Sequence, residues 1–323
     1  MKDRDEQQAA SEGLDRRHFL KCMAWAGSGV LWAMQGGVLR AQVLGASGAG
    51  AVAPDAGEFS FVQISDSHIG FHQAPNLDVL ATLRQTITHV NALPQRPAFV
   101  LHTGDVTHLA KPEQFDTAQQ ALRDIKTDAM FFTPGEHDTA GDNGAEFFRR
   151  FGAGSSGRGW YSFDHRGLHC VGLVNVLDFK PGGLGQLGGD QLEWLEKDLK
   201  GLSASTPIVV FAHMPLWTVY QPWGWGTEDA PTLYSHLRRF GSVTLLNGHI
   251  HQIQQKIEGN MTFYTARGTA FPLPQPGVGP GPLPLASVPA GQLGSYLGLR
   301  EIRHVNVKGP LAVTDIPLAS SRG

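Results

Sequence analysis

Residues 59–68 read Phe59-Ser60-Phe61-Val62-Gln63-Ile64-Ser65-Asp66-Ser67-His68, an apolar run that ends in a carboxylate and an imidazole. The run from Phe59 to Ile64 has the composition of a buried strand. Asp66 and His68 lie just past its end and two residues apart, so in an extended segment both side chains project from the same face. Carboxylates and imidazoles are common ligands of transition metals. The stretch therefore predicts a strand that presents metal ligands at its carboxyl end.

The same arrangement recurs four times further along the chain, where a short polar cluster follows each apolar run. The clusters are Gly104-Asp105, Gly135-Glu136-His137-Asp138, His213 and Gly248-His249-Ile250-His251. With Asp66 and His68 they offer enough carboxylates and imidazoles to bind two metal ions side by side. Two adjacent metal ions are a standard device for cleaving phosphate esters.

Helical spacing of apolar residues alternates with these strands, which predicts an α/β architecture with parallel pairing. Functional residues of such sheets gather at the carboxyl ends of the strands, where all five clusters fall. The stretch 271–289 is rich in Pro, Gly and Leu and is expected to be a long surface loop. Helices are expected at 76–93, 113–126, 191–199 and 232–240, a β-hairpin at 161–176, and later strands at 261–266 and 301–307.

The composition excludes several classes of protein. Of the 323 residues, 41% are hydrophobic, which is enough to bury a large core. The formal net charge is −3 and no long basic run follows the first fifty residues, so binding to long nucleic acid is not expected. Fourteen histidines against two cysteines point to imidazole and carboxylate chemistry and away from thiolate sites.

In their order, the clusters D-x-H, G-D, G-x-H-D, a lone His and G-H-x-H resemble the calcineurin-like metallophosphoesterase family. The resemblance spans about residues 59–270, and Gln191–Leu195 and His213-Met214-Pro215 look like accessory stretches of the family. It implies a four-layer α/β/β/α sandwich with two metal ions, iron, manganese or zinc, at its centre. It also implies hydrolysis of phosphomonoesters or phosphodiesters by a metal-bound hydroxide.

The resemblance assigns roles to individual residues. His137 would protonate the leaving oxygen or stabilise the phosphoryl oxygens. The ligands of the first metal would be Asp66, His68, Asp105 and His251. Those of the second would be Asp105, Glu136, His213 and His249.

Two positions differ from the usual pattern of the family. The family usually has Asn at the position of Glu136, so the centre would carry one more negative charge here. We hypothesise that this charge either suits a trivalent ion such as Fe(III) or favours singly charged phosphodiesters. His108 stands where branches of the family place Asp, Tyr or His. Because a purple acid phosphatase would have Tyr there as an iron ligand, that branch is not expected, and His108 is predicted to orient His137 or to touch the phosphate, which makes it a second catalytic candidate.

Two further side chains are candidates for binding substrate. Trp223 belongs to an aromatic segment after His213, which either packs in the core or forms a loop that stacks on a flat group. Arg267 follows a late strand and is a candidate for contacting phosphate. The rival interpretation is a metal-binding protein on the same scaffold with little turnover, and Glu136 is the feature that favours it. A nuclease is a second rival, against which the lack of a basic stripe argues.

Arg16-Arg17-His18-Phe19-Leu20-Lys21 resembles the twin-arginine export consensus. The apolar stretch 22–34 that follows contains glycines and is short for a membrane span, which needs roughly 20 apolar residues. We expect residues 1–53 to be a twin-arginine signal peptide with an Ala/Gly-rich linker, and 54–323 to be the calcineurin-like domain. The expected location is the periplasm or the exterior, with the twin-arginine export machinery as a partner and no stable membrane span in the mature form.

Overall fold

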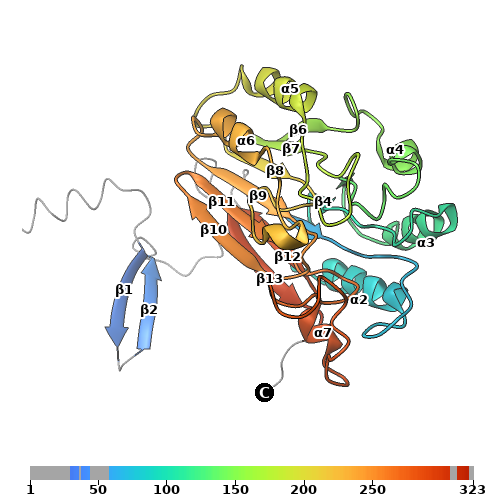
Figure 1. Ribbon diagram of the computed structural model, residues 1–323. Coiled ribbons are helices and arrows are strands. Elements are labelled where there is room, and N and C mark those ends of the chain that lie inside the picture. The colour runs from blue at the N-terminus through green and yellow to red at the C-terminus, as the bar shows by residue number, and fades with distance from the viewer. Residues whose placement is uncertain (1–29, 36–37, 44–57, 306–310, 320–323) are drawn as a thin grey trace, which may run out of the picture. The chain divides into compact units, whose positions relative to one another are not determined.

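The computed structural model of the chain describes residues 30–35, 38–43, 58–305 and 311–319 (Figure 1). Two units are distinguished, Met1–Asp55 and Ala56–Gly323. In the first, β1 (Val30–Gln35) pairs antiparallel with β2 (Val38–Val43). The twin-arginine motif at 16–21 lies outside the described residues.

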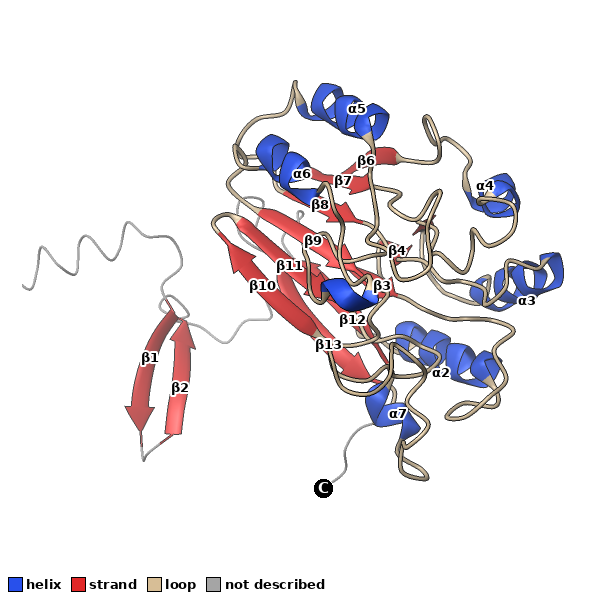
Figure 2. Cartoon of the chain, viewed as in Figure 1, coloured by secondary structure: helices blue, strands red, loops and turns tan. Residues whose placement is uncertain are grey.

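The second unit contains two sheets (Figure 2). The five-stranded sheet has the order β13-β12-β3-β4-β5, and the six-stranded sheet has the order β10-β11-β9-β8-β7-β6. The strands of the first are β3 (Phe59–Ile64), β4 (Phe99–His102), β5 (Ala129–Phe132), β12 (Gly298–His304) and β13 (Ala312–Pro317). Those of the second are β6 (Tyr161–His165), β7 (Leu168–Gly172), β8 (Ile208–Phe211), β9 (Val243–Asn247), β10 (Gln254–Glu258) and β11 (Met261–Thr265).

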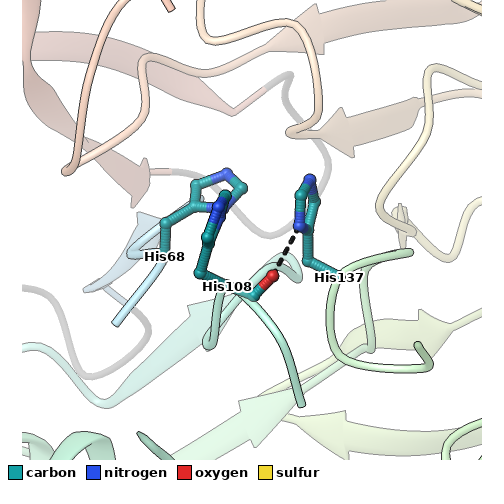
Figure 3. A group of neighbouring side chains, drawn as sticks. All are labelled: His68, His108 and His137. Atoms are coloured by element: carbon teal, nitrogen blue, oxygen red, sulfur yellow. Dashed lines mark hydrogen bonds between the residues drawn. The ribbon is translucent and has the colours of Figure 1, made fainter. Parts of the chain in front are cut away.

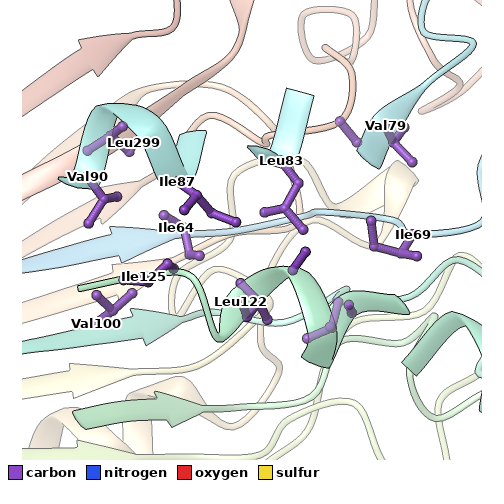
Figure 4. Close-up of a cluster of buried hydrophobic side chains, with 14 of the residues drawn as sticks. Ile64, Ile69, Val79, Leu83, Ile87, Val90, Val100, Leu122, Ile125 and Leu299 are labelled. Carbon is purple, nitrogen blue, oxygen red and sulfur yellow. The ribbon is translucent and has the colours of Figure 1, made fainter. Parts of the chain in front are cut away.

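A pair of helices covers the outer face of each sheet. On the five-stranded sheet, Ile64 and Val100 pack with Leu83, Ile87 and Leu122 of the helices (Figure 4). An equivalent apolar cluster joins the other helix pair to the six-stranded sheet. The first pair is α2 (Val79–Asn91) and α3 (Pro112–Leu122), and the second is α5 (Gly189–Leu199) and α6 (Ala230–Leu237). The short helices are α4 (Ala145–Phe151), η1 (Gln221–Trp223) and α7 (Leu293–Tyr296).

The inner faces of the two sheets pack against each other. Phe61 and Phe99 of the five-stranded sheet stack with ring centroids 4.6 Å apart and share a buried cluster with Cys170, Phe211 and Leu246 of the six-stranded sheet. Burial of such large side chains from both sheets is the main stabilisation that this interface offers. The layers are therefore helices, sheet, sheet, helices, and the predicted four-layer α/β/β/α sandwich is confirmed.

Strand direction differs in part from the expectation. The central runs β3-β4-β5 and β7-β8-β9-β11 are parallel, as predicted. The flanking strands β6, β10, β12 and β13 pair antiparallel, because each joins its sheet through a hairpin or returns beside β3. The antiparallel β6–β7 pair confirms the β-hairpin expected at 161–176, whereas the prediction of parallel pairing was wrong for β12, the later strand expected at 301–307.

Some element boundaries were also missed. The helix expected over 113–126 ends at Leu122, because the amides of Asp124 and Ile125 bond to carbonyls three residues back and close a turn. Helix α4 and strands β10 and β13 were not predicted from the sequence. Both missed strands alternate between half-buried and more exposed positions, a weak signal in a short segment. Residues 271–289 contain no helix or strand, as expected of a long loop, and no helix among the described residues has the length and apolar character to cross a membrane.

Candidate metal centre

The five polar clusters meet at the carboxyl ends of five parallel strands, three from one sheet and two from the other. Backbone bonds align the turns within each sheet, from Asp66 N to Gly104 O at 3.0 Å and from Gly248 N to His213 O at 2.9 Å. Across the sheets, the amide of His249 donates to Asp66 Oδ1 at 3.1 Å. The sandwich therefore brings together loops that are far apart in the sequence, such as those that carry Asp66 and His249.

Five of the candidate ligands have left-handed backbone conformations. Their φ angles are +55° at Asp66, +42° at His68, +51° at Asp105, +69° at His249 and +50° at His251. Residues other than glycine rarely adopt positive φ, and such strain concentrates at functional sites. The extended geometry assumed from the sequence for Asp66 and His68 was thus wrong, although both side chains still face one pocket.

The first pocket is formed by Asp66, His68 and His251, which are buried and could together hold a metal ion. His251 Nε2 lies 3.2 Å from Asp66 Oδ1 and 3.3 Å from His68 Nε2. One carboxylate oxygen and two imidazole nitrogens thus converge on one point.

The second pocket is formed by Glu136, His213 and His249. Glu136 Oε2 lies 2.9 Å from His213 Nε2, and Glu136 Oε1 lies 2.9 Å from His249 Nδ1. This pocket also combines a carboxylate with two imidazoles.

Asp105 lies between the two pockets. Its Oδ2 is 3.5 Å from His68 Nε2 on one side and 3.3 Å from His213 Nε2 on the other. A carboxylate in this position can bridge two metal ions, as the family resemblance implies.

Glycines allow the loops to approach this closely. A Cβ on Gly135 would lie 2.0 Å from Asp105 Oδ1, and one on Gly248 would lie 2.0 Å from Ser65 Oγ. A Cβ on Gly104, whose φ is +96°, would lie 2.4 Å from His213 Nδ1. The glycine of each motif is therefore needed for close packing behind the ligands.

The donor set fits metal ions. Buried polar groups normally have hydrogen-bond partners, and leaving one unsatisfied costs about 1–3 kcal/mol. Within the described part of the chain, Asp66 Oδ2, Glu136 Oε2, His213 Nε2 and both ring nitrogens of His249 are buried without such a partner. These carboxylate and imidazole atoms lie close together but lack hydrogen-bond geometry. This arrangement is expected of atoms that bind the same cation.

The electrostatics of the centre also favour cations. Burial alone would raise the pKa of Asp66, but His251 and His213 lower it to about 2. Burial likewise opposes ionisation of Glu136, yet His249 and His213 bring its pKa well below the usual range. Burial and the neighbouring His137 and His251 lower the pKa of His68 far enough to leave it neutral. Ionised carboxylates and a neutral imidazole are the forms that bind metals.

Two ligand candidates are oriented by backbone carbonyls. Nδ1 of His213 lies 2.7 Å from Thr103 O, and Nδ1 of His251 lies 2.5 Å from Phe271 O. A carbonyl can only accept, so each Nδ1 carries a proton and each Nε2 is the ring nitrogen that faces the pocket. Such outer partners commonly fix the tautomer of metal-binding histidines.

His137 lies beside the two pockets and does not belong to either three-residue set. Its amide donates to Asp105 Oδ1 at 2.9 Å, and its Nδ1 donates to the carbonyl oxygen of His108 at 2.7 Å (Figure 3). Burial lowers the pKa of His137, but Asp105 and Glu136 outweigh this and raise it above the usual value. The ring of His108 stacks on that of His137 at 4.8 Å.

Asp138 is a supporting residue to which sequence reasoning gave no role. Its carboxylate accepts hydrogen bonds from the amides of Val106, Thr107 and Gly135 and from the Thr107 hydroxyl. Burial and the nearby Asp105 raise its pKa to about 7, against the opposing effect of the amides. Its place directly after His137 in the G-x-H-D cluster was the available signal. Asp138 ties the loop that carries Asp105 to the loop that carries Glu136.

Among the described residues, no hydrogen bond, ion pair or ring contact joins the two substrate-contact candidates to the pockets. Trp223 is half-buried in η1, with its ring 5.3 Å from that of Tyr220 and 5.0 Å from that of the fully buried Trp225. The side chain of Arg267 runs past Gly298. Both roles remain predictions.

A two-sheet sandwich with this carboxylate–histidine cluster at its strand ends defines a metallophosphoesterase-like α/β protein. Residues 59–253 match the calcineurin-like phosphoesterase family, and the chain belongs to that family. The predicted family is thus confirmed.

Relatives of this chain include phosphodiesterases and a phosphatase. The chain is 26% identical over 220 residues to the 3',5'-cyclic-nucleotide phosphodiesterase alr5338 of Nostoc sp., covering 66% of this chain and 79% of the relative. It is 25% identical to the serine/threonine-protein phosphatase CPPED1 of Danio rerio, with 61% and 71% covered. Identity is also 25% to a probable glycerophosphodiester phosphodiesterase, GpdQ, of Arcobacter nitrofigilis, with 64% and 76% covered. At the level of the family, the protein is a phosphoester hydrolase.

Solved structures agree with the fold. The purple acid phosphatase PPD1 of yellow lupin superposes with a TM-score of 0.62 at 15% identity, over 83% of this chain and about half, 53%, of the lupin chain. A dimetal phosphatase of Danio rerio superposes with a TM-score of 0.57 at 14% identity, over 80% of this chain and 98% of the other. At such identities the likeness concerns the fold alone.

Proposed function

We propose that the protein is an exported, dinuclear metal-dependent phosphoesterase that hydrolyses small-molecule phosphate esters. The observation that carries this proposal is the pair of pockets that share Asp105. In each pocket a carboxylate and two imidazoles converge. Oδ2 of Asp105 lies within 3.5 Å of an imidazole nitrogen from each pocket, Nε2 of His68 and Nε2 of His213. Two similar pockets with a carboxylate between them suit two ions better than one.

The ligands of the two ions follow from the pockets. The first ion would be held by Asp66, His68, Asp105 and His251, and the second by Asp105, Glu136, His213 and His249. Two bound ions would lower the pKa of water and neutralise phosphoryl charge. Nitrogen and oxygen donors suit iron, manganese or zinc.

His137 is proposed as the acid. Its Nδ1 is engaged with the carbonyl of His108, so Nε2 is the nitrogen that can deliver a proton to the leaving oxygen. The raised pKa of His137 is consistent with a protonated ring near neutral pH. A positioned acid contributes about a hundredfold to ten-thousandfold in rate.

Phosphomonoesters and phosphodiesters are both candidate substrates. The names of two relatives describe phosphodiesterases, whereas another is a protein phosphatase. The extra charge of Glu136 favours singly charged diesters, because a less positive centre attracts a doubly charged monoester less strongly. Faster turnover of monoesters than of diesters would contradict this preference.

Export is proposed from the sequence at 16–21 alone. The twin-arginine route carries folded proteins, so metals can be loaded before export, away from competing ions outside. The proposed location is the periplasm or the exterior.

Hydrolysis of a chromogenic phosphodiester with added Mn(II) tests the function. We expect the metal-loaded protein to hydrolyse the phosphodiester. The kcat of His137→Ala should fall about a hundredfold or more, while this variant still binds metal. His72→Ala is the matched control, because His72 is an exposed histidine apart from the two pockets. Metal binding without turnover of any ester in a broad panel would instead support the rival, a metal-binding protein with little activity.

A further inference from the structure

His68 differs from the other ligand candidates in how its second ring nitrogen is held. The rings of His213 and His251 are each fixed by a backbone carbonyl, which no substitution removes. Nδ1 of His68 instead lies 3.3 Å from Nδ1 of His108, a side chain. The orientation of one ligand in the first pocket therefore depends on a residue that can be changed.

The direction of this hydrogen bond follows from the pocket. Nε2 of His68 faces His251 Nε2 at 3.3 Å and Asp105 Oδ2 at 3.5 Å, so it is the nitrogen that would bind metal. A ligating nitrogen must keep its lone pair, so the proton of neutral His68 sits on Nδ1. His68 Nδ1 then donates to His108 Nδ1, and the proton of His108 sits on Nε2.

The ring of His108 is itself held in place by aromatic neighbours. It packs on the parallel ring of His137 at 4.8 Å, with 18° between the planes, and meets the edge of Phe71 at 5.2 Å. Its backbone carbonyl accepts from His137 Nδ1, so two different parts of one residue contact two different histidines of the site (Figure 3).

We infer that His108 is a positioning residue with a divided role: its side chain orients His68 for the first metal ion, and its carbonyl orients His137. This deepens the proposed function and rests on it. Because a substitution at 108 leaves the backbone carbonyl in place, side-chain variants can remove the contact with His68 Nδ1 and keep the hydrogen bond from His137 Nδ1 to the carbonyl. Partners of this kind typically contribute about 10–100-fold to metal affinity.

The experiment compares His108→Phe with His108→Asn. Phe keeps a planar ring against His137 and Phe71 but has no acceptor, whereas the Asn amide oxygen can accept near the place of Nδ1. We expect Phe to weaken binding of Mn(II), measured by competition with a chelator, by about 10–100-fold, and Asn to restore most of it. His72→Asn is the control for the same chemical change at an exposed histidine.

Wild-type Mn(II) affinity in His108→Phe would overturn the inference. Equal weakening in the Phe and Asn variants would also overturn it, because the ring would then matter for packing and not as an acceptor. If the proposed function is wrong, neither the wild type nor any variant would hydrolyse an ester. The order of their Mn(II) affinities would still be measurable and would test the role of His108 separately.

Discussion

Glu136 presents its two carboxylate oxygens to two different histidines, His213 and His249, each at 2.9 Å. An amide at this position would offer one neutral oxygen. In the proposed dinuclear site, three carboxylates against two divalent ions would leave one net positive charge, where the amide would leave two. A single residue would then change how tightly the ions are held and how strongly they act on substrate.

Neutralising Glu136 is expected to weaken metal binding in the second pocket. Glu136→Gln removes the charge at nearly constant size, and we expect the affinity for Mn(II) to fall about tenfold or more, which corresponds to about 1.4 kcal/mol. Glu136→Asn, which is also shorter, should bind at least as weakly. Calorimetric titration with Mn(II) measures both. Unchanged affinity in the Gln variant would show that the charge has no part in binding.

The identity of the ions tests the companion hypothesis. If the added carboxylate suits Fe(III), then protein purified from its native export route should contain iron, as measured by elemental analysis. Two divalent ions and no iron would rule that explanation out.

At the scale of elements, positive-φ residues and glycines shape most of the turns that carry candidate ligands. The turns after β3, β4 and β9 hold candidate ligands at positive φ. Neighbouring loops pack so closely against the nearby glycines that a side chain there would clash. This strain is compensated by hydrogen bonds between the turns, such as the bonds that Asp138 accepts.

Gly135→Ala is expected to disrupt this packing. The new Cβ would lie 2.0 Å from Asp105 Oδ1 and 2.5 Å from Asp105 N, so the Asp105 carboxylate must move. Overpacking of this kind costs about 1–3 kcal/mol, and we also expect weaker metal binding. Gly201→Ala is the control, because a Cβ there meets nothing within 4 Å. Chemical denaturation measures the stability, and equal stability of the two variants would argue against the steric role.

At the scale of the whole molecule, the centre joins the two sheets. Asp66, Asp105 and Glu136 follow strands of the five-stranded sheet, and His213, His249 and His251 follow strands of the six-stranded sheet. Ions bound between them would connect the two sheets at the carboxyl ends of their parallel strands.

Removing metal should therefore lower thermal stability. A ligand at one hundred times its Kd stabilises a protein by about 2.7 kcal/mol. For a domain of this size that corresponds to about 5 °C or more in Tm. Thermal unfolding of chelator-treated and Mn(II)-loaded protein measures the difference, and Asp105→Asn should show a smaller response to Mn(II). A Tm that does not depend on metal would contradict a link between the sheets.

Much of the fold could be predicted because the central strands are short, mostly apolar and followed by polar turns. Such strands are recognisable in the sequence, as β3 and β9 show. Strands β10 and β13 and helix α4 could not be recognised, because their burial depends on neighbours that fold beside them. Asp138 received no role for a similar reason, since its four hydrogen bonds come from residues of the β4 and β5 turns.

The sequence by itself determined which residues can act: the order of carboxylates, imidazoles and glycines after apolar runs specifies the family and the candidate ligands, because the chemistry of metal binding resides in side chains. Only the tertiary structure decided how they are arranged. It divided the ligand candidates into two pockets around Asp105, placed His68 and His249 in left-handed conformations, and paired His68 with His108. These contacts join loops from two sheets, and packing, not local sequence, sets distances across such an interface.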